Sequence, residues 1–174
     1  MTPATAATAT ALRIRPVEVA DGQAIWQLVR DSGVLDVNSL YCYLLLCRQF
    51  RDTCLVAEEA GEVLGFVTAF RPPAQPEVIF VWQIGVGASA RGRGIAARLL
   101  DHLLRLPACG DVRWLETTVT PDNHASRALF HSAARRWGTR CEVLPGLGPE
   151  LFPGTGHQPE KLHRIGPISE RSHA

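Results

Sequence analysis

Two glycines and two arginines alternate at residues 91–94, between an apolar run and an amphipathic segment. The apolar run, VIFVWQIGV at 78–86, predicts a strand buried on both faces. The segment that begins at Ile95 places its leucines on one stripe of a helix, which Pro107 stops. The first N–H groups of a helix lack internal partners and favour an anion, glycine lets the backbone approach closely, and arginine adds forked donors. The pattern therefore predicts a cradle for a pyrophosphate.

Two classes of phosphate ligand fit this turn. Residues 92–97, GRGIAA, match the dinucleotide pattern G-x-G-x-x-A, and Glu116 lies near the distance expected for an acid that binds a ribose. However, an antiparallel hairpin is predicted before the turn, and the chain after it is too short for six parallel strands. A nucleotide-dependent oxidoreductase is therefore the alternative rather than the leading hypothesis.

The composition indicates one soluble, cytoplasmic domain. The 174 residues carry a formal net charge of +1, which gives no reason to expect a nucleic-acid or membrane partner. The mean hydropathy is +0.02, and the apolar runs are too short to span a bilayer. The N-terminal MTPATAATATA does not resemble a secretory signal. We expect a disordered lead-in over 1–11, a domain over 12–168 and a loose tail over 169–174.

The cysteines and histidines show no metal-type spacing. None of the five cysteines forms a C-x-x-C pair, and most lie beside apolar residues, which predicts reduced, buried thiols. The six histidines are scattered along the chain. We therefore expect no metal site.

The elements expected around the turn make a mixed α/β (α+β) domain. A strand over 12–19 precedes a helix over 21–33, with Asp21 as its N-cap, and a second helix over 37–50, capped by Asn38 or Ser39. A hairpin joins 53–59 to 62–70. After the helix that starts at Ile95 come a strand over 112–120, a helix over 121–138 opened by Pro-Asp, and strands over 140–144 and 163–168. The Gly/Pro-rich stretch 145–161 is too long for a simple connector.

Residues 91–96, RGRGIA, also match the pattern R/Q-x-x-G-x-G/A of the Gcn5-related N-acetyltransferases, and the element order is similar to that family from about residue 12 to 144. The resemblance implies a single-domain fold with a mostly antiparallel sheet, splayed central strands and flanking helices. It also implies acetyl-CoA as the ligand, with its pantetheine arm along the strand that precedes the turn. The coenzyme-binding residues implied in this way are Ile84, Gly85, Val86, Arg91, Gly92, Arg93, Gly94, Ile95, Ala96, Asn123, Ser126 and Phe130.

Longer segments resemble one family within that group, the L-2,4-diaminobutyrate acetyltransferases of ectoine biosynthesis. These segments are RDSGVLDVNSLYCYLLLC, FVTAFRPPAQPEVIFVWQIGV, LETTVTPDNHASRALF and LFPGTGHQPEKLHRIG. The resemblance implies acetyl transfer from acetyl-CoA to the side-chain (N4) amine of L-2,4-diaminobutyrate, an osmoprotective role and a homodimer. An acetyltransferase acting on another small amine is the nearest alternative.

Such a substrate needs acids for its ammonium groups and a group that accepts the proton of the amine, because an alkylammonium has a pKa near 10. Asp36 and Glu116 are the acids we expect to act, and Trp82 is expected to wall the slot beside the thioester. Arg71 is a candidate for the substrate carboxylate, whereas His157 is more typical of a loop histidine than of a base. The substrate-binding candidates are Asp36, Asn38, Ser39, Tyr41, Trp82, Glu116, Thr117 and Thr118.

One position departs from the pattern implied by the resemblance. Many Gcn5-related enzymes carry a tyrosine that protonates the departing thiolate where this sequence has Phe130. Water, Tyr41, Tyr43 or no acid at all are the alternatives. The departure also leaves open a non-catalytic acetyl-CoA-binding module.

Overall fold

A computed structural model describes residues 11–154 and 156–169. The expected lead-in and tail lie almost entirely outside these residues. The described helices and strands are, in chain order, β1 (Arg13–Pro16), α1 (Asp21–Ser32), α2 (Leu40–Gln49), β2 (Leu55–Glu59), β3 (Glu62–Phe70), β4 (Val78–Val86), α3 (Ile95–Leu104), β5 (Trp114–Val119), α4 (His124–Arg136), β6 (Arg140–Leu147) and β7 (Glu160–Gly166), with short 3-10 turns between some of them.

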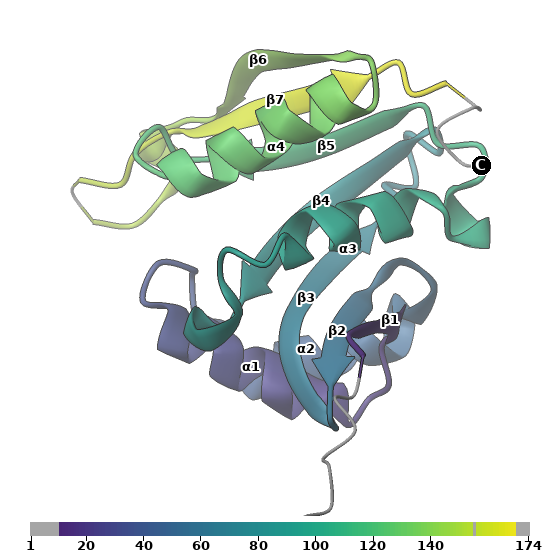
Figure 1. Ribbon diagram of the computed structural model, residues 1–174. Helices are drawn as coiled ribbons and strands as arrows, with labels where there is room; N and C mark the ends of the chain where they lie inside the picture. Colours follow the sequence, from purple (N-terminus) through teal and green to yellow (C-terminus); the bar gives the residue numbers. More distant parts are fainter. Residues whose placement is uncertain (1–10, 155, 170–174) are drawn as a thin grey trace, which may run out of the picture.

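The strands form one sheet in the order β1-β2-β3-β4-β5-β7-β6 (Figure 1). Neighbouring strands are antiparallel except for the central pair β4 and β5, which is parallel. This confirms the expected mixed, mostly antiparallel sheet. It does not suit a doubly wound dinucleotide-binding fold, which needs a mostly parallel sheet.

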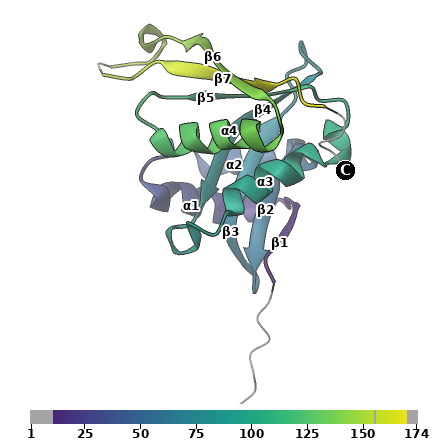
Figure 2. The same ribbon diagram turned by 45° about the horizontal axis from the view of Figure 1, so that its top comes forward.

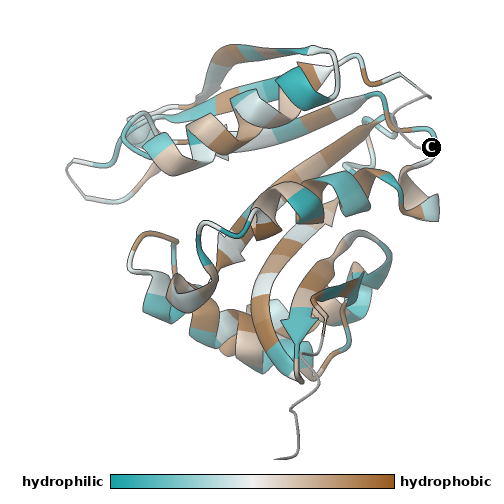
Figure 3. Ribbon diagram, in the orientation of Figure 1, coloured by the Kyte–Doolittle hydropathy of each residue, from teal (hydrophilic) through white to brown (hydrophobic). Residues whose placement is uncertain are grey.

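Helices cover both faces of the sheet (Figure 2). Helices α1 and α2 pack on one face with Val56 and Phe66, whereas α3 and α4 pack on the other with Leu55 and Val67. Neighbouring strand residues point to opposite faces, so this alternation explains why the central strands are apolar along their length (Figure 3). None of the helices in the described ranges is long and apolar enough to cross a lipid bilayer.

The two central strands separate part-way along their length. β4 and β5 pair only from Val78↔Trp114 to Phe80↔Glu116, although β4 continues to Val86. On its other side, β4 pairs with β3 through a register shift that places Thr68 opposite Gln83 and Ala69 opposite Val81, so Trp82 is the extra residue of a bulge. The carboxyl half of β4 therefore has no partner on the β5 side, as expected for a splayed pair.

Several element boundaries differ from those expected. Asp21 is the first residue of α1 rather than its N-cap; its carboxylate accepts a hydrogen bond from the N–H of Glu18 and pairs with Arg15. Burial opposes ionisation of Asp21, but these two partners hold its pKa below the usual value. Asn123, rather than the Pro-Asp before it, caps α4 by accepting from the N–H of Ser126. The stretch 145–161 holds the end of β6 and a 3-10 turn, so it is not structureless.

Candidate active site

Three cavities adjoin one another where β4 and β5 separate. The turn cavity (about 320 Å³) lies at the start of α3, the central cavity (about 370 Å³) lies between the end of β4 and α4, and the acidic cavity (about 360 Å³) lies beneath the 145–161 stretch. The first two share Val86, Arg91, Ala96 and Leu129, whereas the last two share Val34, Leu35 and Asn123. Together they form one track across the splayed strands.

The turn cavity has the features of an anion cradle. Gly92 and Gly94 have φ angles of 78° and 73°, which glycine adopts without strain, and Gly94 is the N-cap of α3. No side chain caps the first N–H groups of α3, so those groups face outward without an internal partner. A Cβ at either glycine would meet nothing within 4 Å, which leaves the backbone open to a ligand.

The two arginines of the turn have different settings. Arg91 lines both the turn cavity and the central cavity, and its Nε lies 3.5 Å from the carbonyl oxygen of Val86. Arg93 instead binds Glu59 on β2 through two hydrogen bonds of 2.7 and 3.0 Å. Arg91 is therefore the arginine that this structure directs along the track.

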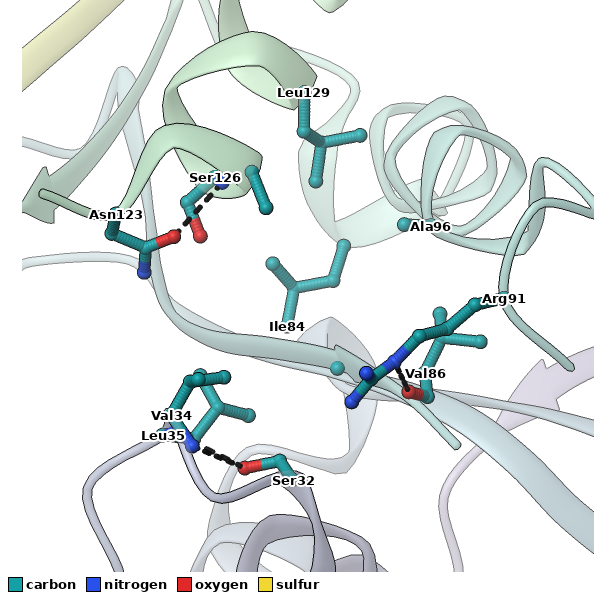
Figure 4. A pocket seen from close by; sticks show the side chains of 12 residues that line it. Ser32, Val34, Leu35, Ile84, Val86, Arg91, Ala96, Asn123, Ser126 and Leu129 are labelled. Atoms are coloured by element: carbon teal, nitrogen blue, oxygen red, sulfur yellow. Dashed lines mark hydrogen bonds between the residues drawn. The ribbon is translucent and has the colours of Figure 1, made fainter. Parts of the chain in front are cut away.

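The central cavity is narrow and mostly apolar. Figure 4 shows Asn123, the cap of α4, with Ser126 and Leu129 of that helix on one side of Ile84. Val34 and Leu35 lie on the other side. A Cβ at Gly85 would lie 2.8 Å from the ring of Phe66 and 3.0 Å from Leu35, so only glycine fits there. Because β4 has lost β5 at this point, its free backbone groups can pair with an extended ligand as a further strand would.

The acidic cavity gathers Asp36, Glu160 and Thr118 with Trp82. Burial raises the pKa of Glu160, and the negative charges of Asp36 and Asp122 raise it further, against a lowering hydrogen bond from Thr118 and a nearby His157. A cation that binds beside such a carboxylate stabilises its ionised form. The cavity therefore suits a ligand with ammonium groups.

The loop that carries Asp36 is fastened to β4 by buried polar contacts. Gln83 donates a 2.8 Å hydrogen bond from its side-chain nitrogen to the carbonyl oxygen of Asp36. Its side-chain oxygen accepts from the hydroxyl of the fully buried Tyr43. The bulge at Trp82 makes this arrangement possible, because Trp82 and Gln83 both line the acidic cavity although they are consecutive.

Comparison with known proteins identifies the family. Residues 23–134 match the model of the acetyltransferase (GNAT) family. The chain belongs to the GNAT family of acetyltransferases. This acetyltransferase is 50% identical over 150 residues (86% of this chain, 84% of the relative) to the L-2,4-diaminobutyric acid acetyltransferase of Shouchella clausii. It is 48% identical over 162 residues (90% and 82%) to the enzyme of the same name from Chromohalobacter salexigens.

A solved structure is similar over nearly the same length. The diaminobutyrate acetyltransferase EctA from Paenibacillus lautus, in complex with its substrate L-2,4-diaminobutyric acid and coenzyme A, is 47% identical, with a TM-score of 0.88. The match covers 92% of this acetyltransferase and 97% of that chain. These relatives place it in the diaminobutyrate acetyltransferase branch of the GNAT family.

Many of the residues expected from the sequence lie together along the track of this acetyltransferase. The acidic cavity brings Asp36, Asn38, Trp82 and Thr118 together. The residues expected to bind the coenzyme that line the other two cavities are Ile84, Gly85, Val86, Arg91, Gly92, Gly94, Ile95, Ala96, Asn123 and Ser126.

Other expected residues lie elsewhere. Glu116 does not line these cavities: its carboxylate lies 3.1 Å from Nε of Arg164, the residue opposite it on β7. Ser39 caps α2, and Tyr41 projects from that helix with 69% of its surface exposed. Thr117 is buried on β5. Arg71 is paired with Asp111, so its guanidinium is already engaged.

Phe130 is 1% exposed and belongs to the hydrophobic core, and its neighbour Leu129 lines the central cavity instead. A tyrosine at this position would have its ring buried in the hydrophobic core and not in the cavity. Tyr43 is also removed from the cavities, because its hydroxyl is held by Gln83. This acetyltransferase therefore presents neither tyrosine of α2 nor Phe130 to the track.

The sequence analysis missed Glu160, Leu147 and Phe152, which line the acidic cavity of this acetyltransferase. All three belong to or border the 145–161 stretch, as does His157, whose ring stacks on Phe152 at 3.7 Å between centroids. The signal was the unusual length of that stretch, since long ordered loops in small domains are often functional.

Proposed function

We propose that the chain transfers the acetyl group of acetyl-CoA to the N4 amine of L-2,4-diaminobutyrate, giving N4-acetyl-L-2,4-diaminobutyrate in ectoine biosynthesis. The observation that carries the proposal is the single track that joins an anion cradle at α3 to a cavity with two acids, Asp36 and Glu160. The relatives named above share the expected substrate.

The residues of the track fit acetyl-CoA, which supplies the acetyl group as a thioester. The uncapped N–H groups of α3 and the guanidinium of Arg91 hold the diphosphate. The backbone of Ile84–Val86 pairs with the pantetheine arm, and Asn123, Ser126 and Leu129 enclose it from α4. A backbone N–H of this unpaired part of β4 donates to the thioester oxygen as that atom gains negative charge.

The acidic cavity binds and orients the amine. The carboxylates of Asp36 and Glu160 attract the two ammonium groups, and the face of Trp82 limits the space beside the thioester. Glu160 has the role that the sequence led us to expect of Glu116. It accepts the proton that the N4 ammonium must lose before attack. The new C–N bond forms as the C–S bond breaks, and the coenzyme thiolate leaves without a tyrosine acid because its pKa is close to that of a free thiol.

The proposal includes a cytoplasmic homodimer built on the domain 12–168. β6 is an edge strand of the described sheet, and the side chains of Val143, Leu147 and Leu151 on or beside it are 50%, 48% and 64% exposed. A second copy that covered this edge would bury them. Light scattering of the wild type against a V143K/L151K variant tests this part, with loss of the dimer in the variant as the expected result.

The reaction is tested by the release of coenzyme A thiol from acetyl-CoA with L-2,4-diaminobutyrate, ornithine and lysine as acceptors. We expect the fastest release with diaminobutyrate, and a lower kcat/KM of about tenfold or more for each longer amine. A D36N variant should raise KM for the amine, whereas D31N, on the exposed end of α1, should not. Stabilisation by acetyl-CoA with no thiol release from any of these amines would leave a binding module instead, and stabilisation by NAD(P)H alone would favour the oxidoreductase.

A further inference from the structure

Three metal-ligating side chains meet behind α4, on the side of the C-terminal strands. His131 comes from α4, Cys141 from β6 and His163 from β7, and one ligand atom from each lies within 4.8 Å of the other two. Val143 is directly opposite His163 in the antiparallel ladder, so Cys141 is its diagonal neighbour on the same face. Helix α4 packs on both strands and brings His131 to them.

The spacing of the trio is close to that of a tetrahedral site. Sγ of Cys141 lies 3.7 Å from Nδ1 of His163, and the rings of His131 and His163 meet edge to face with centroids 5.7 Å apart. Zinc bonds of about 2.3 Å to sulfur and about 2.0 Å to nitrogen place neighbouring ligand atoms roughly 3.3–3.6 Å apart. A contraction of up to roughly 1.5 Å, within the reach of side-chain rotation, would complete the three bonds.

The surroundings favour a metal ion over a simple buried histidine. The side chain of His163 is 1% exposed, and the hydrogen-bonding contact that the described residues give its ring is the long one to Cys141. Burial, together with the charges of His131 and Arg127, lowers the pKa of His163. Cys141 and His131 are half-buried, which leaves an ion a path from solvent.

We propose that His131, Cys141 and His163 bind a zinc ion, with water at the fourth position. A thiolate and two imidazoles form a donor set that zinc favours over magnesium or calcium. Binding exchanges the thiol proton of Cys141 for a sulfur–zinc bond and releases the proton to solvent. The ion fastens α4 to β6 and β7, and the same helix carries Asn123, Ser126 and Leu129 to the coenzyme track. The site is thus a clamp outside the reaction, and it does not depend on the proposed substrate.

The experiment titrates the metal-free full chain with zinc alone by calorimetry, and with Co²⁺ as an optical probe. We expect one equivalent of zinc to bind, with a binding enthalpy that changes with the ionisation enthalpy of the buffer because a proton is released. We also expect visible Co²⁺ absorption typical of tetrahedral coordination, together with a thiolate charge-transfer band. C141S and H131Q, both at half-buried positions, should each weaken binding by at least about 100-fold. C42S is the matched control, since Cys42 is equally half-buried but lies on α2, and it should bind zinc as the wild type does.

A second control separates this trio from the acidic cavity, where His157 lies with Asp36 and Glu160. H157Q should leave zinc binding unchanged. The proposal is overturned if the wild type binds no zinc, if H157Q abolishes binding, or if C141S and C42S behave alike. If C141S is less stable, the Co²⁺ spectrum of its folded fraction still tests the proposal. Loss of the thiolate band supports Cys141 as the ligand, whereas a band that persists would come from another thiolate and would overturn the proposal.

Discussion

The hydroxyl of Tyr43 on α2 donates a 3.0 Å hydrogen bond to the side-chain oxygen of Gln83 on β4. Gln83 in turn binds the loop, because its side-chain nitrogen donates a hydrogen bond to the carbonyl oxygen of Asp36. Tyr43 is fully buried and does not line the cavities, yet it fixes the loop that carries one of the two acids. It acts as a positioning residue.

Replacing Tyr43 with phenylalanine should therefore affect the amine and not the coenzyme. Y43F leaves the oxygen of Gln83 unsatisfied, which should lower the free energy of unfolding by about 1–3 kcal/mol. We expect KM for diaminobutyrate to rise by roughly tenfold while the Kd for acetyl-CoA stays the same. Denaturant unfolding and steady-state kinetics measure both, with Y41F on the exposed face of α2 as the neutral control. Equal losses for the two ligands would contradict the positioning role.

Gly94 should be needed for coenzyme binding beyond its effect on stability. G94A forces a residue with a side chain to a φ of 73°, at a cost of about 1–2 kcal/mol, and places a methyl group where the diphosphate approaches. G138A is matched to it, since Gly138 has a φ of 64°, similarly open surroundings, and a position at the far end of α4. Both variants should lose stability, but only G94A should weaken acetyl-CoA binding in calorimetry, by about tenfold or more. Unchanged affinity in G94A would remove the anion cradle from the proposal.

Glu160 should make stability and binding depend on pH in opposite ways. Because its folded pKa is raised above the ordinary value, the native state holds this proton more tightly than the unfolded chain does. Its contribution to stability is thus fully present below the ordinary pKa of a glutamate and is lost as pH rises through the raised folded value. In the absence of ligand, E160Q should melt at a higher temperature than the wild type at pH 7, with the difference shrinking towards pH 4.

In the same variant, diaminobutyrate should bind more weakly at pH 7, because a negative partner for the ammonium group is missing. E62Q removes a glutamate from the exposed start of β3 and should change neither property. Thermal unfolding at several pH values, with and without diaminobutyrate, provides the measurement. A lower melting temperature for ligand-free E160Q at pH 7 would show that the ionised carboxylate stabilises the fold instead.

Restoring a tyrosine at Phe130 should not restore an acid. The side chain of Phe130 is 1% exposed in the core, so F130Y must bury a hydroxyl without a partner, at a cost of about 1–3 kcal/mol. We expect a lower melting temperature and no increase in kcat, whereas F50Y at a position that is 39% exposed should be neutral. A clear rise in kcat for F130Y would mean that the ring turns towards the track during the reaction.

The sequence predicted the order of the elements, and most of the residues it predicted for the coenzyme line two adjoining cavities. The anion cradle depends on consecutive residues, 91–96, whose strand–turn–helix setting can be recognised locally. The proposed substrate cavity is different, because Asp36, Trp82, Thr118 and Glu160 come from four distant segments. Glu116 had an equally good sequence setting, but its place in the ladder opposite Arg164 gives it another partner. The register of β7 against β5 decides between these two acids, and no local pattern reveals that register.

Bulges and clusters of distant residues are likewise tertiary features. The register shift at Trp82 changes which side chains share a face, so two consecutive residues serve one cavity. The expectation of no metal site rested on spacing along the chain, whereas His131, Cys141 and His163 meet only after α4 folds onto the β6–β7 pair. Their separation in sequence hides them from any spacing rule.

The short ladder between β4 and β5 suggests that the stability of the fold depends on the concentration of coenzyme. The ladder between the two halves of the sheet consists of three residue pairs, and beyond them β4 is not paired with β5. A ligand that forms hydrogen bonds with this unpaired part of β4 and also contacts α4 would connect the two halves of the sheet. At a concentration of about 100 times its Kd, such a ligand adds about 2.7 kcal/mol to the free energy of unfolding. Under the proposed function, saturation with acetyl-CoA therefore stabilises the folded enzyme, and removal of the acetyl donor lowers its resistance to unfolding.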